Sequence, residues 1–271
     1  MRKTGKILFS FAMVVILVFG GLFVWKENGN RKEAAAKEQM AKKQTVKKTD
    51  STLKKKAGVK AKNQIKIAID AGHQRYGNSA TEPVGPGAKT KKAKVSGGAV
   101  GVATKTPEYK LTLQVAKKLK KTLVERGYQV YMVRSSNNVN ISNKQRAIRA
   151  NKSGADIYIR IHADSSASSG VRGASMLYPS TKNPYVKSLS KPSKRLSNCI
   201  LKSYCKKTGI KSRGLFTRDD LTGTNWSEIP VTLIEMGFLS NSVEDRYMQK
   251  AANQKKMAAG IADGVDDYFG F

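Results

Sequence analysis

The sequence contains only two histidines, and each follows a short apolar segment. His73 comes after residues 65–69 (IKIAI), and His162 comes directly after residues 157–161 (IYIRI). Short segments rich in β-branched residues predict buried strands. The carboxyl ends of parallel strands lie at one edge of a sheet, where α/β proteins build their sites, so we expect the two imidazoles to meet there. Imidazole is a common zinc ligand, and the pair therefore predicts a metal site.

A carboxylate as third ligand would complete a catalytic zinc site and leave one position open for water. Glu108 is the strongest candidate, because it lies in the first turn of an expected helix and faces a loop that can fold over the same edge. The alternative role of Glu108 is a favourable interaction with the positive end of that helix, and spacing alone does not decide between the two. Other candidates are Asp70, Glu82 and Asp164.

Glu235 follows a third apolar segment, residues 231–234 (VTLI). A carboxylate there also reaches the carboxyl edge of the sheet, where it can take a proton from zinc-activated water and deliver it to a leaving amine. Zinc lowers the pKa of bound water to about 7, which makes this transfer feasible near neutral pH. The alternative is a buried ion pair of Glu235 with Arg134 or Arg160.

Strands and helices that must position these residues alternate along the chain. Strands are expected at 65–69, 129–133, 157–161, 174–178, 215–218 and 230–236, and helices at 106–127, 142–150, 185–207, 243–248 and 251–269. The stretch 74–105, rich in Gly, Lys, Ser and Thr, is expected to be a long loop. The alternation predicts a single α/β domain over residues 64–271, with a central, mostly parallel twisted sheet flanked by helices.

The N-terminal part of the sequence differs in character. Residues 7–25 form an uncharged apolar run, preceded by Arg2, Lys3 and Lys6, that nearly spans a bilayer as a helix. No small-residue cleavage pattern closes the run, so we expect residues 1–25 to be an uncleaved signal anchor in the cell membrane, with the domain outside the cell. Secretion after cleavage is the alternative. Residues 26–63 contain few large apolar side chains and are expected to be a basic disordered tether.

The formal net charge is +32, and both the tether and the domain are basic. Such a charge favours an anionic partner. Charge alone gives only non-specific affinity for nucleic acid, and no nucleic-acid-binding motif is present, so we expect no specific nucleic-acid ligand. Anionic wall or membrane polymers remain as partners. Cys199 and Cys205 are six residues apart in one expected helix and face different directions, which does not predict a disulfide.

Four motifs resemble the zinc-dependent N-acetylmuramoyl-L-alanine amidases of the amidase-3 type. They occur in the family's order, and the similarity covers nearly all of residues 65–271; they are 67–73 (IAIDAGH), Glu108, 155–164 (ADIYIRIHAD) and 231–241 (VTLIEMGFLSN). The resemblance implies that His73, Glu108 and His162 bind Zn²⁺ and that Glu235 is catalytic. It also implies a sheet of six strands and a peptidoglycan substrate, cut at the amide between the lactyl group of N-acetylmuramic acid and the L-alanine of the stem peptide.

Two positions depart from the family's S-I-H-A-N pattern, because this chain has Arg160 and Asp164 in place of the Ser and the Asn. We expect Arg160 to point opposite to Ile161 and to have no need to touch the metal. These changes affect substrate preference more than reaction class.

Three residues outside the expected metal site are weaker candidates for substrate binding. They are Trp226, Asn241 and Arg134. Trp226 lies in a Gly- and Thr-rich loop just before the strand of Glu235, where it either stacks on sugar or peptide or anchors the loop. Two other functions stay open: a zinc peptidase acting within the stem peptide, and a non-catalytic wall-binding module.

Overall fold

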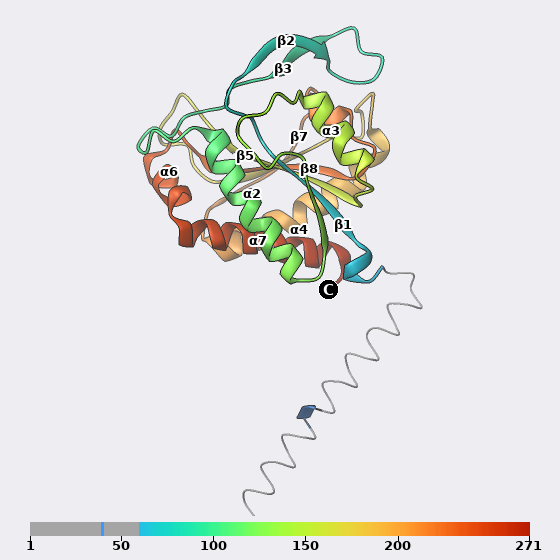
Figure 1. The fold of residues 1–271 in the computed structure, drawn as a ribbon. Helices are drawn as coiled ribbons and strands as arrows, with labels where there is room; N and C mark the ends of the chain where they lie inside the picture. Colours follow the sequence, from blue (N-terminus) through green and yellow to red (C-terminus); the bar gives the residue numbers. More distant parts are fainter. Residues whose placement is uncertain (1–38, 41–59) are drawn as a thin grey trace, which may run out of the picture. The chain divides into compact units, whose positions relative to one another are not determined.

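A six-stranded sheet forms the centre of the domain, in the order β4–β1–β5–β8–β6–β7 (Figure 1). The strands β4, β1, β5 and β8 are mutually parallel, whereas β6 pairs antiparallel with β8 and parallel with β7. This confirms the predicted mostly parallel sheet. The bounds are β1 (Lys66–Ala71), β4 (Gln129–Met132), β5 (Ile157–Asp164), β6 (Ala174–Tyr178), β7 (Ser212–Thr217) and β8 (Val231–Phe238).

The computed structural model describes residues 39–40 and 60–271. The expected signal anchor and nearly all of the expected tether lie outside these residues. Within the part that is described, no helix has both the length and the apolar character needed to cross a membrane. The two cysteines, Cys199 and Cys205, are free thiols.

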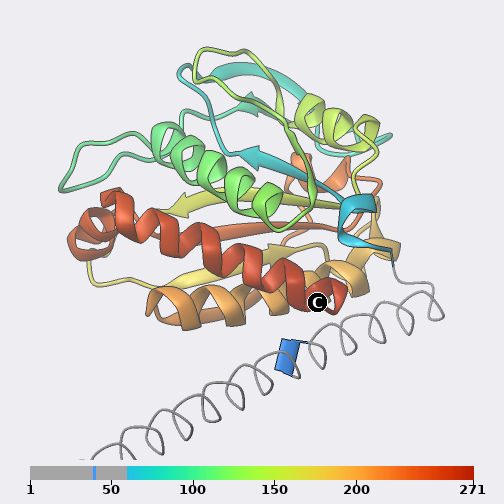
Figure 2. The same cartoon turned by 60° about the horizontal axis from the view of Figure 1, so that its bottom comes forward.

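One face of the sheet is covered by α2 (Glu108–Glu125), α4 (Ser190–Thr208) and α7 (Ala251–Phe269) (Figure 2). The large core lies here, and alternate residues of the central strands point into it, among them Ile67 and Ile69 of β1 and Ile159 and Ile161 of β5. The short α6 (Ser242–Gln249) packs beside α7. Because these strands are covered on both faces, they show continuous apolar runs in the sequence.

The opposite face of the sheet is covered by α3 (Asn143–Lys152), by the short α5 (Thr222–Asn225) and by a smaller apolar cluster. Ala147 and Ala150 of α3 pack there against Ala68, Tyr158 and Val231, which lie on β1, β5 and β8. The side chains of Asp70, Arg160, His162 and Glu235 follow the same alternation and belong to this face as well.

Residues 74–105 contain a β-hairpin, so the prediction of a long loop was wrong. The strands are β2 (Asn78–Pro83) and β3 (Lys91–Val95), paired antiparallel. Most of their side chains are exposed. A two-stranded ribbon of Lys, Ser and Thr lacks the alternation of apolar and polar residues by which a strand is recognised in a sequence. The hairpin lies over the face of the sheet that carries α3 (Figure 1).

Two helix starts show how local sequence fixes the elements around the site. Ser142 caps α3 as a capping box, since its hydroxyl accepts from the Gln145 backbone while the Gln145 side chain accepts from the Ser142 backbone. The helix expected from residue 106 begins two residues later, because α2 starts at Glu108 with Pro107 in the N-cap position. Further along, a 3-10 turn, η2 (Lys187–Leu189), leads into α4.

The start of the described domain lies against its C-terminal end. Lys62, in the 3-10 turn η1 (Lys62–Gln64), donates to Asp266 at 2.6 Å, and its ammonium lies 4.8 Å from the centre of the Phe271 ring. The Tyr128 hydroxyl donates to the same Asp266 oxygen at 2.6 Å. Tyr128 immediately precedes β4, and Lys62 lies shortly before β1, so these contacts lie at the end of the sheet away from His73.

Candidate metal centre and active site

His73, Glu108 and His162 converge at the carboxyl ends of β1 and β5. His73 Nε2 lies 3.1 Å from Glu108 Oε2, and His162 Nδ1 lies 3.1 Å from Glu108 Oε1. His162 Nδ1 and His73 Nε2 are also 3.1 Å apart. Ligands placed about 2.0–2.1 Å from a tetrahedral zinc ion are separated by about 3.3 Å, so this donor set fits one ion. Sequence reasoning correctly placed the three residues together.

The His73 ring is oriented by the chain around it. His73 adopts a left-handed backbone conformation with φ of 60°. Its Nδ1 lies 2.9 Å from the Ser96 carbonyl oxygen at the end of the hairpin, which fixes Nδ1 as the protonated nitrogen. Nε2 then presents a lone pair toward Glu108 and His162, as a metal ligand must.

Two glycines allow the ligands to approach so closely. A Cβ at Gly72 would lie 2.4 Å from the ring of His162, and a Cβ at Gly98 would lie 2.9 Å from Glu108 Oε2. Gly98 also has a φ of +79°. Any side chain at either position would push a ligand out of the site.

The protonation states of Glu108 and His162 suit a cation. Burial opposes ionisation of Glu108, but the close imidazoles of His162 and His73 outweigh burial, and the pKa of Glu108 falls well below its usual range. The carboxylate also accepts from the backbone of Ala99 at 3.0 Å and of Ala163 at 3.1 Å. Burial lowers the pKa of His162 to about 4, so its ring is neutral at pH 7 and offers a lone pair.

Glu235 lies beside His162, because the two are register partners on β8 and β5. Its Oε2 is buried and has no hydrogen-bond partner among the residues that the structure describes. Burial raises the pKa of Glu235 well above its usual range, and the nearby carboxylates of Glu108 and Asp164 raise it further. Glu235 forms no ion pair with Arg134 or Arg160, the arrangement we considered as an alternative. A buried carboxyl group with a raised pKa can accept a proton and release it again.

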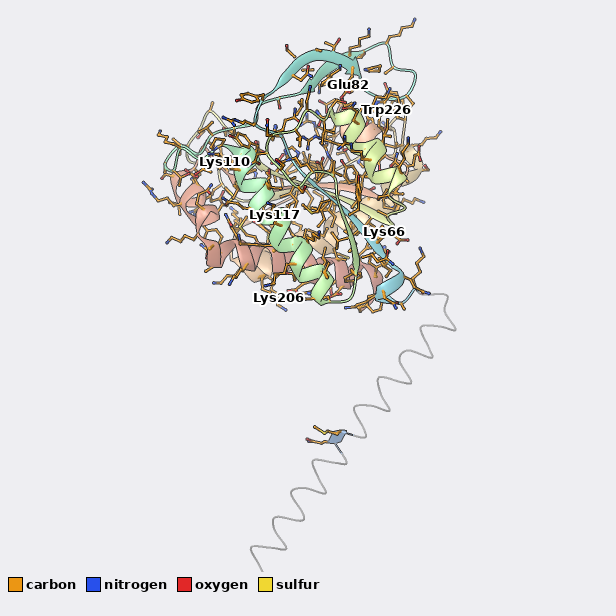
Figure 3. The ribbon with its side chains drawn as sticks, in the orientation of Figure 1. Lys66, Glu82, Lys110, Lys117, Lys206 and Trp226 are labelled. Atoms are coloured by element: carbon orange, nitrogen blue, oxygen red, sulfur yellow. The ribbon has the colours of Figure 1, made fainter. Side chains whose placement is uncertain are left out.

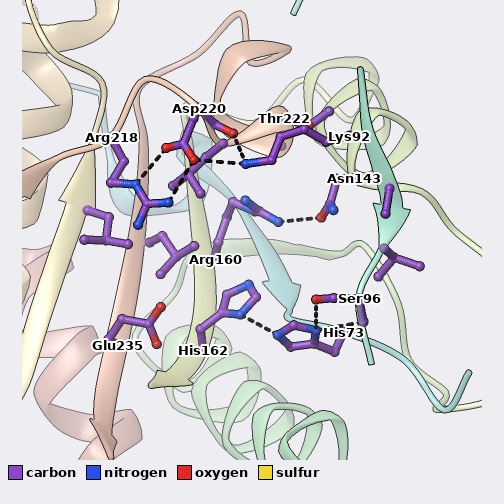
Figure 4. A pocket seen from close by; sticks show the side chains of 16 residues that line it. His73, Lys92, Ser96, Asn143, Arg160, His162, Arg218, Asp220, Thr222 and Glu235 are labelled. Carbon is purple, nitrogen blue, oxygen red and sulfur yellow. Dashed lines mark hydrogen bonds and ion pairs between the residues drawn. The ribbon is translucent and has the colours of Figure 1, made fainter. Parts of the chain in front are cut away.

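Figure 4 shows the cavity of about 350 Å³ into which these groups point. His73, His162 and Glu235 line one side of it, and Lys92, Arg218 and Asp220 line another. The hairpin strand β3 and the segment that follows β7 supply this second group of residues. Sequence reasoning missed all three, because no motif marks them.

Trp226 lies outside this cavity, between the hairpin and α3. Its Nε1 donates to the Pro83 carbonyl at 3.0 Å, and the Lys144 ammonium lies 4.0 Å from the centre of its ring. Figure 3 shows it near Glu82, below the hairpin. These contacts correspond to the loop-anchoring role, and substrate stacking by Trp226 stays a prediction.

Asn241 and Arg134 also lie outside the cavity lining. Asn241 caps α6, since its side-chain oxygen accepts from the backbone of Val243 and Glu244. Arg134 is buried and donates to several main-chain oxygens, which are those of Ala71, Gly72, Tyr109 and Ser136. Both residues hold the main chain around the site in these contacts, and their binding of substrate stays a prediction.

The rival carboxylates have other partners. Glu82 accepts from the backbone of Lys144 at 2.9 Å, in the first turn of α3. Asp164 accepts from the backbone of Ser165 at 2.7 Å. Asp70 is fully buried and bonded to two arginines, with Arg146 Nη1 2.7 Å from Oδ1 and Arg160 Nε 3.2 Å from Oδ2.

The buried network around Asp70 holds the main chain next to the candidate metal site. Burial would raise the pKa of Asp70, but the charges of Arg146 and Arg160 outweigh it and lower the pKa to about 2. Arg146 also donates to the His73 carbonyl at 2.9 Å and so holds the turn that carries the first ligand. Arg160 points opposite to Ile161, as expected, because Ile161 lies in the large core; it shares a face with His162 and lines the same cavity.

Asp70→Asn is expected to destabilise the domain by about 3–5 kcal/mol, because it leaves two buried guanidinium groups without their counter-charge. Urea unfolding followed by circular dichroism measures this, with Glu125→Gln on the exposed side of α2 as the control. The pKa of Asp70 is lower in the folded state, so its stabilisation is present above about pH 4 and is lost as the pH falls toward 2. A variant as stable as the control would contradict this account of the network.

Comparison with protein families gives a match to the Amidase_3 model, described as N-acetylmuramoyl-L-alanine amidase, over residues 67–267. The chain belongs to this family. The match spans β1 to α7 and includes all four residues placed in the site. It confirms the resemblance that the motifs indicated.

The individual proteins that resemble the chain are distant relatives in sequence. N-acetylmuramoyl-L-alanine amidase LytC of Bacillus subtilis (strain 168) is 27% identical over 60% of this chain and 31% of its own length. N-acetylmuramoyl-L-alanine amidase Rv3717 of Mycobacterium tuberculosis (strain ATCC 25618 / H37Rv) is 26% identical over 73% of this chain and 84% of its own length. The Probable cell wall amidase LytH of Staphylococcus epidermidis is matched over 54% of its length. The chain therefore spans about a third of the length of LytC and about half of the length of LytH.

Solved structures share the fold. The catalytic domain of CwlV, an N-acetylmuramoyl-L-alanine amidase from Bacillus (Paenibacillus) polymyxa var. colistinus, superimposes with a TM-score of 0.60 at 28% identity, over 75% of this chain and 97% of that one. Ami1 from Mycobacterium smegmatis gives a TM-score of 0.69 at 24% identity, over 76% of this chain and 97% of that one. At that identity, the second likeness is evidence for the fold alone.

Proposed function

We propose that this chain is a zinc-dependent peptidoglycan amidase. It hydrolyses the amide between the lactyl group of N-acetylmuramic acid and the L-alanine of the stem peptide. The observation that carries the proposal is the convergence of His73, Glu108 and His162 on one point, beside a buried Glu235 oxygen that has no hydrogen-bond partner within residues 60–271. Membership of the Amidase_3 family and the names of its relatives support the choice of bond.

A zinc ion held by His73, Glu108 and His162 would polarise the scissile carbonyl and make water nucleophilic near neutral pH. Glu235 takes the proton of the attacking water on Oε2, which has no hydrogen bond to the described part of the chain that would have to break. It then delivers that proton to the leaving nitrogen of L-alanine, which would otherwise depart as an unstable amide anion. The hydrogen bond of His73 to the Ser96 carbonyl keeps the ligand ring in place throughout.

Digestion of purified peptidoglycan by the zinc-loaded protein tests this function. An amidase releases L-alanine amino termini and leaves the sugars intact, and we expect these termini to appear and to vanish when a chelator is added. New termini at other stem residues would instead identify a peptidase. Binding to the polymer without new termini would identify a wall-binding module.

We propose in addition that residues 1–25 anchor the protein in the cell membrane and that residues 26–63 tether the domain outside the cell, near its substrate. The support comes from the apolar run 7–25 and the basic composition of the segment after it. Protease treatment of intact cells should degrade the domain and leave a membrane-bound fragment. A domain recovered intact in the cytosolic fraction would overturn this topology.

A further inference from the structure

Three charged side chains gather on the cavity wall away from the metal ligands. Arg218 donates two hydrogen bonds to Asp220, from Nε to Oδ1 at 2.7 Å and from Nη2 to Oδ2 at 2.9 Å. Lys92, from the hairpin, donates to the same Oδ2 at 2.9 Å. The Asp220 carboxylate is therefore paired with two cations. The cluster of Lys92, Arg218 and Asp220 has one positive charge more than negative charge.

The cations of this cluster are accessible, unlike the other arginine of the cavity. The side chains of Arg218 and Lys92 are 46% and 43% exposed, whereas that of Arg160 is 4% exposed and its guanidinium is bonded to Asp70 and Asn143. Nη1 of Arg218 makes no hydrogen bond to any of residues 60–271. Ion pairs at such exposure are weak, so Arg218 and Lys92 retain capacity for a second anion.

The cluster lies close to the reacting groups. Arg218 and Glu235 influence each other's pKa, and Figure 4 shows Arg218 on the side of the cavity nearer Glu235, with Asp220 between it and Lys92. His73, His162 and Glu235 line the same continuous cavity as the three charged residues. An anionic group attached near the scissile amide can therefore reach the excess positive charge while the amide lies at the metal centre.

We propose that Arg218 and Lys92 form a subsite for a carboxylate of the stem peptide and make the enzyme prefer acidic over amidated stem peptides. The inference rests on the proposed amidase function and names the substrate feature that the site selects. A substrate carboxylate would balance the charge of the cluster, giving two cations and two anions. Asp220 holds the Arg218 fork in place, which is the arrangement that favours planar recognition of a carboxylate.

Two synthetic muramoyl peptides test the subsite, identical except that the residue after L-alanine carries a free carboxylate or a carboxamide. We expect kcat/KM of the wild type to favour the acid by about tenfold or more, the size of effect that a charge-assisted hydrogen bond produces. Arg218→Gln should lower kcat/KM for the acid by about tenfold to a hundredfold and change that for the amide by less than about threefold. Lys92→Gln should act in the same direction, with a smaller loss.

Lys91→Gln is the matched control, because Lys91 is an exposed neighbour on β3 that does not line the cavity. It should leave kcat/KM unchanged for both peptides. Equal rates of the wild type on acid and amide, or an equal loss on both in Arg218→Gln, would overturn the subsite.

The affinities of both peptides, measured by calorimetry, test the carboxylate subsite separately from the amidase function. If the zinc-loaded wild type hydrolyses neither peptide, the proposed function fails, yet a binding preference for the acid that disappears in Arg218→Gln still establishes the subsite. Equal binding of acid and amide would overturn it whether or not hydrolysis occurs.

Discussion

Glu235→Gln is expected to lower kcat by about a hundredfold to ten-thousandfold, which is the usual contribution of a general acid–base residue. Glutamine keeps the shape of the side chain but can neither accept the proton of water nor return it to the leaving nitrogen. Since Oε2 of Glu235 has no hydrogen-bond partner in the described domain, the substitution breaks no hydrogen bond of that atom there. Turnover of a muramoyl peptide measures the effect, and zinc content and thermal unfolding should stay close to wild type.

Glu228→Gln controls for the loss of a negative charge, because Glu228 is exposed and does not line the cavity. It should retain wild-type turnover. If Glu235→Gln kept more than about a tenth of wild-type kcat, another group would have to move the proton, and the assignment of Glu235 would be withdrawn.

Glu108→Gln is expected to weaken zinc binding by at least about a hundredfold and to abolish turnover at limiting zinc. The substitution removes the charged member of the ligand set, whose two oxygens face His73 and His162. Bound zinc stabilises the folded state by about 2.7 kcal/mol when free zinc is a hundred times its Kd. The wild type should therefore unfold at a higher temperature with zinc, and Glu108→Gln should lose most of that shift.

The comparison with Glu125→Gln isolates the ligand role of Glu108. Both residues lie on α2, but Glu125 is exposed and its ion pair is with Lys121, one turn earlier on the same helix. Its replacement should leave the zinc-dependent shift in unfolding temperature intact. If the shift in Glu108→Gln equals that of wild type, Glu108 is not a ligand and its carboxylate acts only on the helix and the two histidines.

The parts of the fold predicted well from sequence are those where one residue pattern has one structural meaning. β5 and β8 are apolar runs because they lie in the middle of the sheet and are covered on both faces. Each run is followed or interrupted by a residue that has no place in a core, His162 and Glu235. The same logic placed His73 at the shared edge, so the approach of the two histidines to each other was predictable from the sequence.

Other parts of the site could not be predicted, because they depend on contacts between residues that are far apart in the sequence. Lys92 and Asp220 are separated by 128 positions, and neither belongs to a recognisable motif. Arg146 lies in a helix whose sequence, NKQRAIRANK, is polar enough to suggest a solvent-exposed surface. Only the tertiary fold shows that this guanidinium is buried against Asp70. Charge is informative in a sequence when it interrupts an apolar run, and uninformative when its neighbours are also polar.

The contact of Lys62 with Asp266 and Phe271 has a practical consequence for engineering. Because the first and last residues of the described domain lie close together, a short linker from Phe271 back to residue 61 should be tolerated. Circular permutants with new ends at exposed turns are therefore feasible. The junction also lies at the amino ends of β1 and β4, whereas the cavity opens beyond the carboxyl ends. A fluorescent reporter fused after Phe271 should therefore leave the path of an incoming polymer unobstructed.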